Sequence, residues 1–308
     1  MDQENIIPII NDEGIYDEGW ENGLKDFPGI EELQNNLDAL MAIDKSQMSQ
    51  DEIRTLAYQK LVMLPNASNT IKKDIFNSQP FWRTRKNVMD NEDVTQVSTF
   101  SYPPSCSNNG RANLKSKSVF YCSNGRSTAL FESRPLVGEI VYLTEWSTLS
   151  DRDVQIRFLL SESLSESNPF YGFMLRQIEE IKGFSKRYGK EKAMQLEMIT
   201  RFLANAFVIE NPPYAFTSWL ANEILFGATP VDVLYYPSVT TQKISCNLAI
   251  SPSFTDKYLS AKRIYKLQIT EQTETNIRQE IVAVGDINNK KIVWRETTQS
   301  DFNYLNGK

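Results

Sequence analysis

The chain contains no histidine. Serine–histidine and cysteine–histidine nucleophilic systems are therefore excluded, as are metal centres that depend on imidazole ligands. The three cysteines, Cys106, Cys122 and Cys246, stand far apart and form no Cys-x-x-Cys pair, so neither a zinc site nor a disulfide framework is indicated. Any catalysis must depend on carboxylates, arginines, hydroxyls, tyrosines or lysines.

Other absences narrow the class of protein. There is no apolar run near 18 residues and no basic stretch followed by an apolar one at the N-terminus, so we expect a cytoplasmic protein that does not enter a membrane. Neither Gly-x-Gly-x-x-Gly nor Gly-x₄-Gly-Lys-Ser/Thr is present, which excludes the two standard nucleotide-binding loops. The net charge of −6 gives no global support for direct nucleic-acid binding.

Acidic residues are concentrated at the beginning of the chain. Residues 1–60 hold 14 Asp or Glu and 4 Lys or Arg, whereas the remaining 248 residues carry a balance of +4. Residues 1–27 are rich in glycine breakers and are expected to be loop-like and partly disordered. Apolar spacing predicts two helices within residues 29–62, the second beginning near Ser49 and Asp51. We therefore expect an acidic, mainly helical extension at 1–72 and a main domain at 73–308.

The main domain mixes strand-like and helical segments. β-Branched and aromatic residues bounded by turn formers predict strands at 81–84, 118–122, 139–146, 231–236 and 246–250, and three more within 263–271 and 278–297. Helical spacing predicts helices at 127–133, 151–208 and 215–226, the last ending at Gly227 in the usual position of a C-terminal glycine. The predicted fold class is α+β.

Four segments in the main domain carry residues suited to chemistry. In chain order they are Phe81-Trp82-Arg83, Gly110-Arg111-Ala112-Asn113 with the strand Val119-Phe120-Tyr121, Thr128-Ala129-Leu130-Phe131-Glu132, and Val233-Leu234-Tyr235-Tyr236-Pro237-Ser238 with Cys246-Asn247-Leu248-Ala249. This ordered set resembles the RES domain family over residues 80–255, and the region around Tyr214 and the helix ending at Gly227 is also similar to it. Two departures are Leu114, where the family often has proline, and a loop at 239–245 without the usual glycines.

The resemblance implies a split-sheet core like that of ADP-ribosyltransferases, here with a helical insertion at about 151–205. It implies a toxin that binds NAD⁺ in a cleft and breaks the nicotinamide–ribose bond, as a glycohydrolase or, with phosphate as co-substrate, as a phosphorylase. Mono-ADP-ribosyl transfer to a protein or nucleotide is the alternative. We expect no metal or other cofactor. Many family members are paired with an antitoxin, so a neutralising antitoxin or immunity protein is the expected partner.

The chemistry of this reaction suits a chain without histidine. Nicotinamide leaves NAD⁺ as a neutral pyridine, so no general acid is needed. The transition state resembles an oxocarbenium ion and is stabilised by a nearby carboxylate, as in glycosidases. The diphosphate requires cationic donors with the fork geometry that arginine supplies.

The resemblance assigns roles to charged residues, each of which also has an ordinary structural explanation. Glu132 is the expected carboxylate at the nicotinamide-bearing ribose; alternatively it is an exposed helix carboxylate or a partner for Arg134. Arg83, as a catalytic residue, and Arg111 are expected to bind the diphosphate; alternatively they are surface arginines or parts of structural ion pairs. Arg85 could replace Arg83 in this role.

Three uncharged residues complete the predicted site. Tyr121 is expected to stack on nicotinamide or ribose, although a strand tyrosine is equally often a packing residue. Ser238 follows a proline and is expected to hydrogen-bond the substrate, unless it only forms the turn. Asn247 is expected to hold the Ser238 loop through its side chain.

Alternatives remain open at the level of the whole chain. The protein could be a non-catalytic binding module that kept the fold, or an assembly protein built around its helices, and a homo-oligomer is compatible with the sequence. The acidic extension could pack on the core, or it could regulate the site by weakening NAD⁺ binding until it moves.

Overall fold

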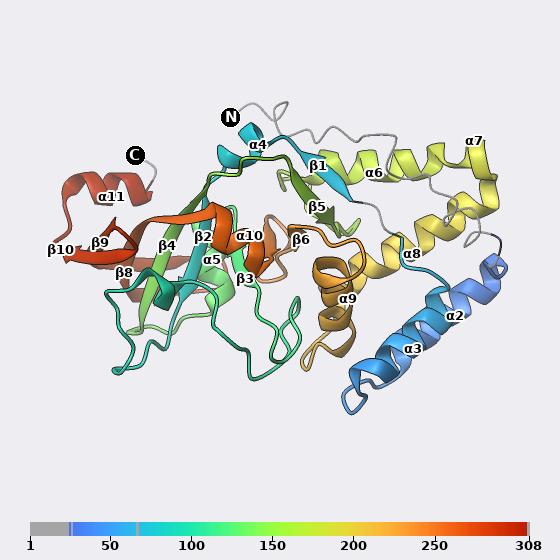
Figure 1. Ribbon diagram of the computed structural model, residues 1–308, viewed down its shortest axis with the longest axis horizontal. Coiled ribbons are helices and arrows are strands. Elements are labelled where there is room, and N and C mark those ends of the chain that lie inside the picture. The colour runs from blue at the N-terminus through green and yellow to red at the C-terminus, as the bar shows by residue number, and fades with distance from the viewer. Residues whose placement is uncertain (1–24, 26, 66–67, 307–308) are drawn as a thin grey trace.

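The computed structural model describes residue 25 and residues 27–65 and 68–306, so the expected loop at 1–27 lies almost entirely outside the described residues. Within this part of the chain, ten strands form one mixed sheet in the order β1-β5-β6-β7-β3-β2-β4-β8-β9-β10 (Figure 1). The α+β class is confirmed. The strands are β1 (Asn69–Ile71), β2 (Phe81–Arg85), β3 (Phe120–Ser123), β4 (Ile140–Thr148), β5 (Val154–Phe158), β6 (Val233–Pro237), β7 (Cys246–Ile250), β8 (Leu259–Gln272), β9 (Ile277–Asn288) and β10 (Lys291–Arg295).

The sheet is nearly divided at its centre. β3 and β2 are paired only at Trp82 and Ser123, whereas β2 pairs with β4, and β3 with β7, along their whole lengths. Next to this single pair, a guanidinium nitrogen of Arg83 donates a hydrogen bond to the backbone oxygen of Tyr121 at 2.8 Å. A side chain therefore bridges the gap where a backbone ladder would otherwise continue. We call this gap between β3 and β2 the central split.

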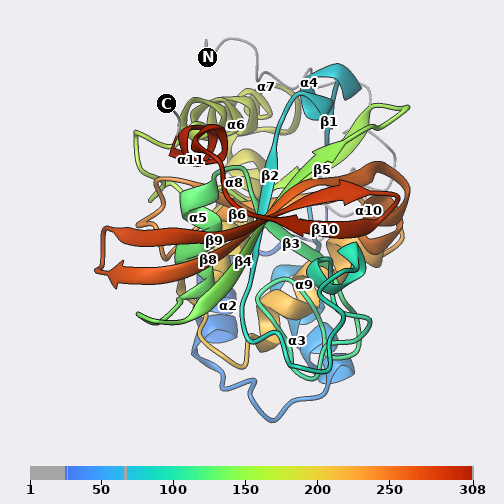
Figure 2. The same ribbon diagram turned by 90° about the vertical axis from the view of Figure 1, so that its left-hand side faces the viewer.

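Helices cover both faces of the sheet. The described helices are α2 (Ile30–Ala42), α3 (Gln50–Leu61), α4 (Lys73–Asn77), the 3₁₀ turn η3 (Val97–Phe100), α5 (Arg126–Ser133), α6 (Tyr171–Gly183), α7 (Ser185–Tyr188), α8 (Lys190–Ile209), α9 (Ala215–Phe226), α10 (Pro252–Tyr258) and α11 (Gln299–Asn306). One apolar cluster joins α2, α3, α8 and α9 to one face of the half-sheet that contains β6, and a second, on the opposite face, includes α4, α6 and α10. In Figure 2 the long β8–β9 hairpin, at the far end from α2 and α3, faces the viewer. No described helix is both long and apolar enough to cross a membrane.

The two predicted N-terminal helices are confirmed. Ser49 caps α3 through a reciprocal capping box with Glu52, which satisfies backbone donors at the start of the helix. Leu33, Leu37 and Leu40 of α2 are buried, as are the inner residues of α3, in the cluster formed with α8 and α9. The helices at 30–61 therefore pack as part of the core, which is the first of the two alternatives for the N-terminal extension. The acidic segment 1–24 lies outside the described residues.

The prediction that residues 151–208 are helical is wrong at its start. Residues Val154–Phe158 form strand β5, which pairs in parallel with β6, and α6 begins only at Tyr171. A short apolar run buried on both faces cannot be distinguished from a buried helix by its spacing alone. The other predicted strands and helices are confirmed with small shifts at their ends.

The glycine that ends α9 is required for a different reason from the one expected. Gly227 has a φ of −74°, so it does not adopt the left-handed conformation of a usual C-terminal glycine. A Cβ atom at this position would lie 2.2 Å from the backbone oxygen of Glu223. Close approach of the backbone, and not a positive φ, therefore explains the glycine.

Candidate functional site

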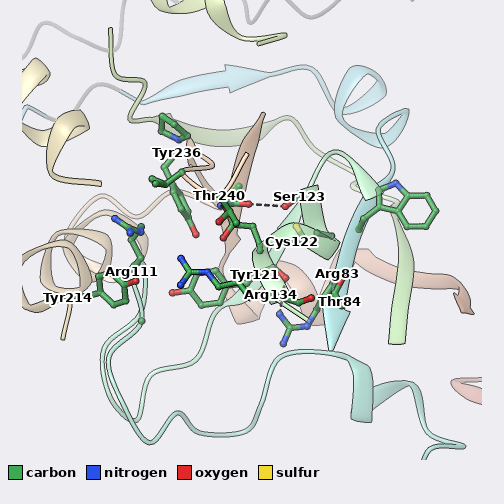
Figure 3. Close-up of a pocket in the computed structure, with 18 residues that line it drawn as sticks. Arg83, Thr84, Arg111, Tyr121, Cys122, Ser123, Arg134, Tyr214, Tyr236 and Thr240 are labelled. Carbon is green, nitrogen blue, oxygen red and sulfur yellow. Dashed lines mark hydrogen bonds between the residues drawn. The ribbon is translucent and has the colours of Figure 1, made fainter. Parts of the chain in front are cut away.

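A cavity of about 290 Å³ opens at the central split (Figure 3). We call it the split cavity. Its walls come from β2, β3, α5, the loop at 110–113, the ends of β6 and β7, and the residue before α9. Five of the seven predicted site residues line it together, from segments far apart in the sequence: Arg83, Arg111, Tyr121, Glu132 and Asn247.

Glu132, in the last turn of α5, is fixed by two donors. Its Oε1 accepts hydrogen bonds from the Oγ of Ser238 at 2.5 Å and from the Nδ2 of Asn247 at 2.7 Å. The Oδ1 of Asn247 accepts a bond from the Oγ of Ser123 at 2.8 Å, which fixes the orientation of the amide. The second carboxylate oxygen of Glu132 accepts no hydrogen bond within the described part of the chain. The described ion pairs also do not include Glu132 with Arg134, the alternative that the sequence left open.

Ser238 lies behind Glu132. Its side chain is fully buried, and it donates to the carboxylate instead of lining the split cavity. The expectation that Ser238 hydrogen-bonds a substrate directly is therefore corrected for this conformation: the serine orients the carboxylate. Asn247 also donates to this carboxylate, from β7, and its side chain bonds Glu132 and Ser123 instead of the Ser238 loop that it was predicted to hold.

The loop at 238–245 closes without glycine. Two of its residues, Gln242 and Lys243, adopt positive φ values of 52° and 63°. The Oγ of Ser245 accepts a bond from the Oγ1 of Thr128 at 2.8 Å and lies 2.8 Å from the Oγ1 of Thr241, so hydroxyl groups join this loop to α5. These contacts keep Ser238 against Glu132.

Tyr121 holds the loop that carries Arg111. Its hydroxyl donates to the Oδ1 of Asn113 at 2.9 Å and accepts from the backbone nitrogen of Ala112 at 2.8 Å. A Cβ atom on Gly110 would lie 2.3 Å from the Oδ1 of Asn113 and 2.8 Å from the Tyr121 hydroxyl, so a larger residue would displace these two side chains from their present contact. Burial raises the pKa of Tyr121 above its ordinary value, which keeps the phenol protonated as a donor.

Arg111 is held by a carbonyl and an aromatic ring. Its Nη1 donates to the backbone oxygen of Phe207 at 2.5 Å, and its guanidinium carbon lies 4.8 Å from the centre of the Tyr214 ring. No carboxylate pairs with Arg111 among the described residues, so its positive charge is uncompensated. Tyr214 and Tyr236 also line the cavity, and Figure 3 shows both rings near Arg111. No role was predicted for either tyrosine, although both lie in regions that carry the resemblance.

Arg83 fills the central split. It bonds the backbone oxygen of Tyr121, and its guanidinium lies 5.5 Å from the centre of the Phe120 ring. Its Nε is buried and forms no hydrogen bond within the described residues. Burial lowers the pKa of Arg83 to about 10, which still leaves it charged at neutral pH. A half-buried cation without a carboxylate partner favours an anionic ligand.

The structure does not bring Arg85 to the split cavity. Arg85 forms an ion pair with Glu92 and bonds the backbone oxygen of Thr99. It lines a second cavity of about 1000 Å³, which also contacts Arg83, Tyr102 and Trp146. We call this second space the larger cavity. The suggestion that Arg85 replaces Arg83 is therefore corrected.

Cys122 lines the split cavity but is a poor nucleophile. Burial raises the pKa of its thiol, so the reactive thiolate is disfavoured. In the described part of the chain, no three His, Cys, Asp or Glu side chains are grouped to hold a metal ion. The chemically useful groups are thus one oriented carboxylate, unpaired guanidinium groups and tyrosine rings.

Comparisons with family models, curated proteins and solved structures find no match to this chain. The chemistry of the split cavity and the resemblance in the ordered sequence segments therefore remain as the indications of function.

Proposed function

We propose that this protein cleaves the bond between nicotinamide and ribose in NAD⁺, with the substrate bound in the split cavity. The observation that carries the proposal is the geometry of Glu132. Two neutral donors hold one carboxylate oxygen, while the side chain lines a cavity that also contains Arg83 and Arg111. A fixed carboxylate beside unpaired cations suits a substrate that has both an incipient positive charge and a diphosphate.

In this proposal Glu132 acts on the ribose that carries nicotinamide. Its second oxygen accepts a hydrogen bond from a ribose hydroxyl. The carboxylate also stabilises the positive charge that develops as the carbon–nitrogen bond breaks. Nicotinamide leaves with the electron pair of that bond as a neutral base, so no proton donor is needed. Ser238 and Asn247 keep the carboxylate in place, which lowers the reorganisation required in the transition state.

The remaining residues bind the rest of the dinucleotide. Arg83 and Arg111 contact the diphosphate, and the Tyr214 and Tyr236 rings pack against the nicotinamide riboside. A cavity of about 290 Å³ is at the lower end of the range for ligand sites, and it suits this half of the molecule better than the whole of it. The adenosine half would then extend from the mouth of the cavity.

Water, phosphate or a macromolecule could accept the ADP-ribosyl group after this first step. Glycohydrolase or phosphorylase activity would deplete NAD⁺, and a chain of this kind would require a neutralising partner in its host. A mono-ADP-ribosyltransferase would instead add the mass of ADP-ribose to a protein or nucleotide. Mass spectrometry of the products separates these outcomes.

The direct test is nicotinamide release from NAD⁺ by the purified full-length chain. Glu132→Gln keeps the shape and the hydrogen bonds from Ser238 and Asn247 but removes the charge, and we expect release to fall by about 100-fold to 1000-fold. Glu139→Gln is the matched control, because Glu139 lies near Lys86 and does not line the split cavity. Folded wild-type protein that released no nicotinamide, even with cell extract as a source of acceptors, would contradict the proposal.

Expression in cells provides a second readout. If the chain depletes NAD⁺, wild-type expression should lower the cellular NAD⁺ level and slow growth, while Glu132→Gln should do neither at equal protein abundance. Loss of growth without loss of NAD⁺ would favour transfer to a specific target.

A further inference from the structure

Tyr236 places a hydroxyl group in the split cavity. The residue stands in β6 and is only 4% exposed, and the centre of its ring lies 5.3 Å from the centre of the Phe207 ring. It nevertheless lines the split cavity, and Figure 3 shows its side chain reaching into the cavity on the side where Arg111 lies. Because packing holds the ring, the position of the hydroxyl is set before any ligand binds.

The strand register places this side chain beside the proposed catalytic carboxylate. Tyr236 is opposite Asn247 in the antiparallel pairing of β6 with β7, and directly opposed residues share one face of a sheet. From that face Asn247 donates its hydrogen bond to Glu132. The preceding residue, Tyr235, points to the opposite face and packs in the second apolar cluster. Tyr236 is thus the cross-strand neighbour of a residue that holds Glu132.

The hydroxyl of Tyr236 is open to the cavity. Among the described residues it takes part in no hydrogen bond, and it is not one of the side-chain atoms that are buried without a partner. Its oxygen therefore keeps a surface that a ligand can contact. Burial raises the pKa of the phenol, and the charge of Glu132 raises this pKa further while that of Arg111 lowers it. The group is a neutral phenol, which can both donate and accept a hydrogen bond.

The charged groups near the hydroxyl indicate which part of a ligand it meets. In the proposed function Glu132 lies at the ribose that carries nicotinamide, and Arg111 lies at the diphosphate. Tyr236 is close enough to both for their charges to alter the pKa of its phenol. The part of NAD⁺ that connects the nicotinamide-bearing carbon to the diphosphate is the ribose, whose polar groups are hydroxyls. A neutral phenol that donates and accepts suits such a hydroxyl.

Of the ribose hydroxyls, the one on C3′ fits this position best. The C2′ hydroxyl is next to the carbon that loses nicotinamide, where the second oxygen of Glu132 is placed by the proposed function. The C3′ hydroxyl lies one carbon further from the breaking bond, on the way to the diphosphate and therefore toward Arg111. We propose that the Tyr236 hydroxyl bonds the C3′ hydroxyl of the nicotinamide ribose and makes the site selective for a ribose on which this hydroxyl is free. This inference rests on the proposed function.

ADP-ribose and ADP are suitable probes, because they share adenosine and diphosphate and differ in the terminal ribose. Tyr236→Phe removes an oxygen that has no partner in the described part of the chain, so the variant should melt at the temperature of wild type. By calorimetry on the full-length chain, we expect it to bind ADP-ribose about fivefold to tenfold more weakly and ADP as wild type does. Tyr235→Phe makes the same change on the opposite face of β6 and should bind both probes as wild type does.

Three outcomes would overturn the inference: equal affinity of wild type and Tyr236→Phe for ADP-ribose, an equal loss for ADP-ribose and ADP, or no binding of ADP-ribose to the wild type. A loss for ADP-ribose alone, without any nicotinamide release by wild type, would uphold the ribose contact and contradict the proposed function. Nicotinamide release with an ADP-ribose affinity that does not depend on Tyr236 would do the reverse.

Kinetics with a modified dinucleotide assign the hydroxyl. With NAD⁺, Tyr236→Phe should lower kcat/KM for nicotinamide release about tenfold. An NAD⁺ analogue without the C3′ hydroxyl on its nicotinamide ribose should react about tenfold more slowly with wild type, and Tyr236→Phe should cause no further loss with it. An equal effect of the variant on both substrates would overturn the assignment to C3′.

Discussion

The two cavities that share Arg83 differ in the way their charges are compensated. In the larger cavity Arg85 is paired with Glu92, and the Tyr102 hydroxyl lies 2.8 Å from both carboxylate oxygens of Asp256. In the split cavity Glu132 is held by neutral donors, and Arg111 has no carboxylate partner among the described residues. Arg83 lines both cavities, so the smaller cavity is the more informative one because it also holds the fixed carboxylate of Glu132 and the Arg111 guanidinium.

Replacing one arginine in each cavity should give the largest difference in kcat/KM between two variants. Arg111→Gln removes an unpaired cation, and we expect kcat/KM for nicotinamide release to fall by about 100-fold. Arg85→Gln makes the same chemical change in the larger cavity and should alter kcat/KM by less than about threefold, because Arg85 is already paired. Equal losses in the two variants would remove the distinction between the cavities.

Removal of the Tyr121 hydroxyl tests whether its hydrogen bonds position the loop that carries Arg111. Tyr121→Phe leaves Asn113 and the Ala112 nitrogen without this partner, at a cost of about 1–2 kcal/mol in the free energy of unfolding. We expect KM to rise about tenfold with little change in kcat, since the carboxylate is untouched. Tyr142→Phe is the control, because no described hydrogen bond involves the Tyr142 hydroxyl. An unchanged KM in Tyr121→Phe would show that the loop does not need this contact.

Because Arg83 is the cation at the central split, anion binding in the split cavity should weaken at alkaline pH. The pKa of Arg83 is lowered to about 10, so the group is charged below that pH and becomes neutral as the pH rises through it. Anion affinity should be constant from about pH 7 to 9 and should fall several-fold by about pH 11. Trp82 lines the cavity, so tryptophan fluorescence can follow NAD⁺ binding to Glu132→Gln, with circular dichroism to check the fold. An affinity for NAD⁺ that stays unchanged up to pH 11 would show that the charge of Arg83 does not contribute to binding.

The smallest effect is expected in the larger cavity. Asp256→Asn weakens the contact with Tyr102 at an exposed position, and it should reduce the free energy of unfolding by less than about 1 kcal/mol. Nicotinamide release should remain within about twofold of wild type. A strong loss of activity in this variant, at unchanged stability, would assign the larger cavity a part in the reaction.

Local signals in the sequence were sufficient for much of the fold. Ser49 and Asp51 marked the start of α3, and aromatic and β-branched residues marked β2 and β6. The strand at Val154–Phe158 was predicted as helix, because its identity depends on parallel pairing with β6, about 80 residues later in the chain. The single pair of residues between β3 and β2 also could not be read from the sequence, since it depends on long-range register.

The site was predictable where the ordered segments carry the resemblance. That resemblance singled out Glu132 and Arg111, whose residue types also suit a reaction without histidine, and the structure brings both to one cavity. Ser238 was identified, but its contact with Glu132 was not, because the partner lies 106 residues away. Tyr236 and Asn113 were missed as functional candidates. The face of β6 that reaches the cavity depends on its register with β7, and the bond from Tyr121 to Asn113 depends on how the loop folds back.

A crystal structure of the Glu132→Gln variant with NAD⁺ would show where the dinucleotide binds. We expect the nicotinamide riboside in the split cavity, with a ribose hydroxyl within hydrogen-bonding distance of residue 132 and the diphosphate at Arg83 and Arg111. Dinucleotide bound instead in the larger cavity, or an empty split cavity at saturating NAD⁺, would contradict it.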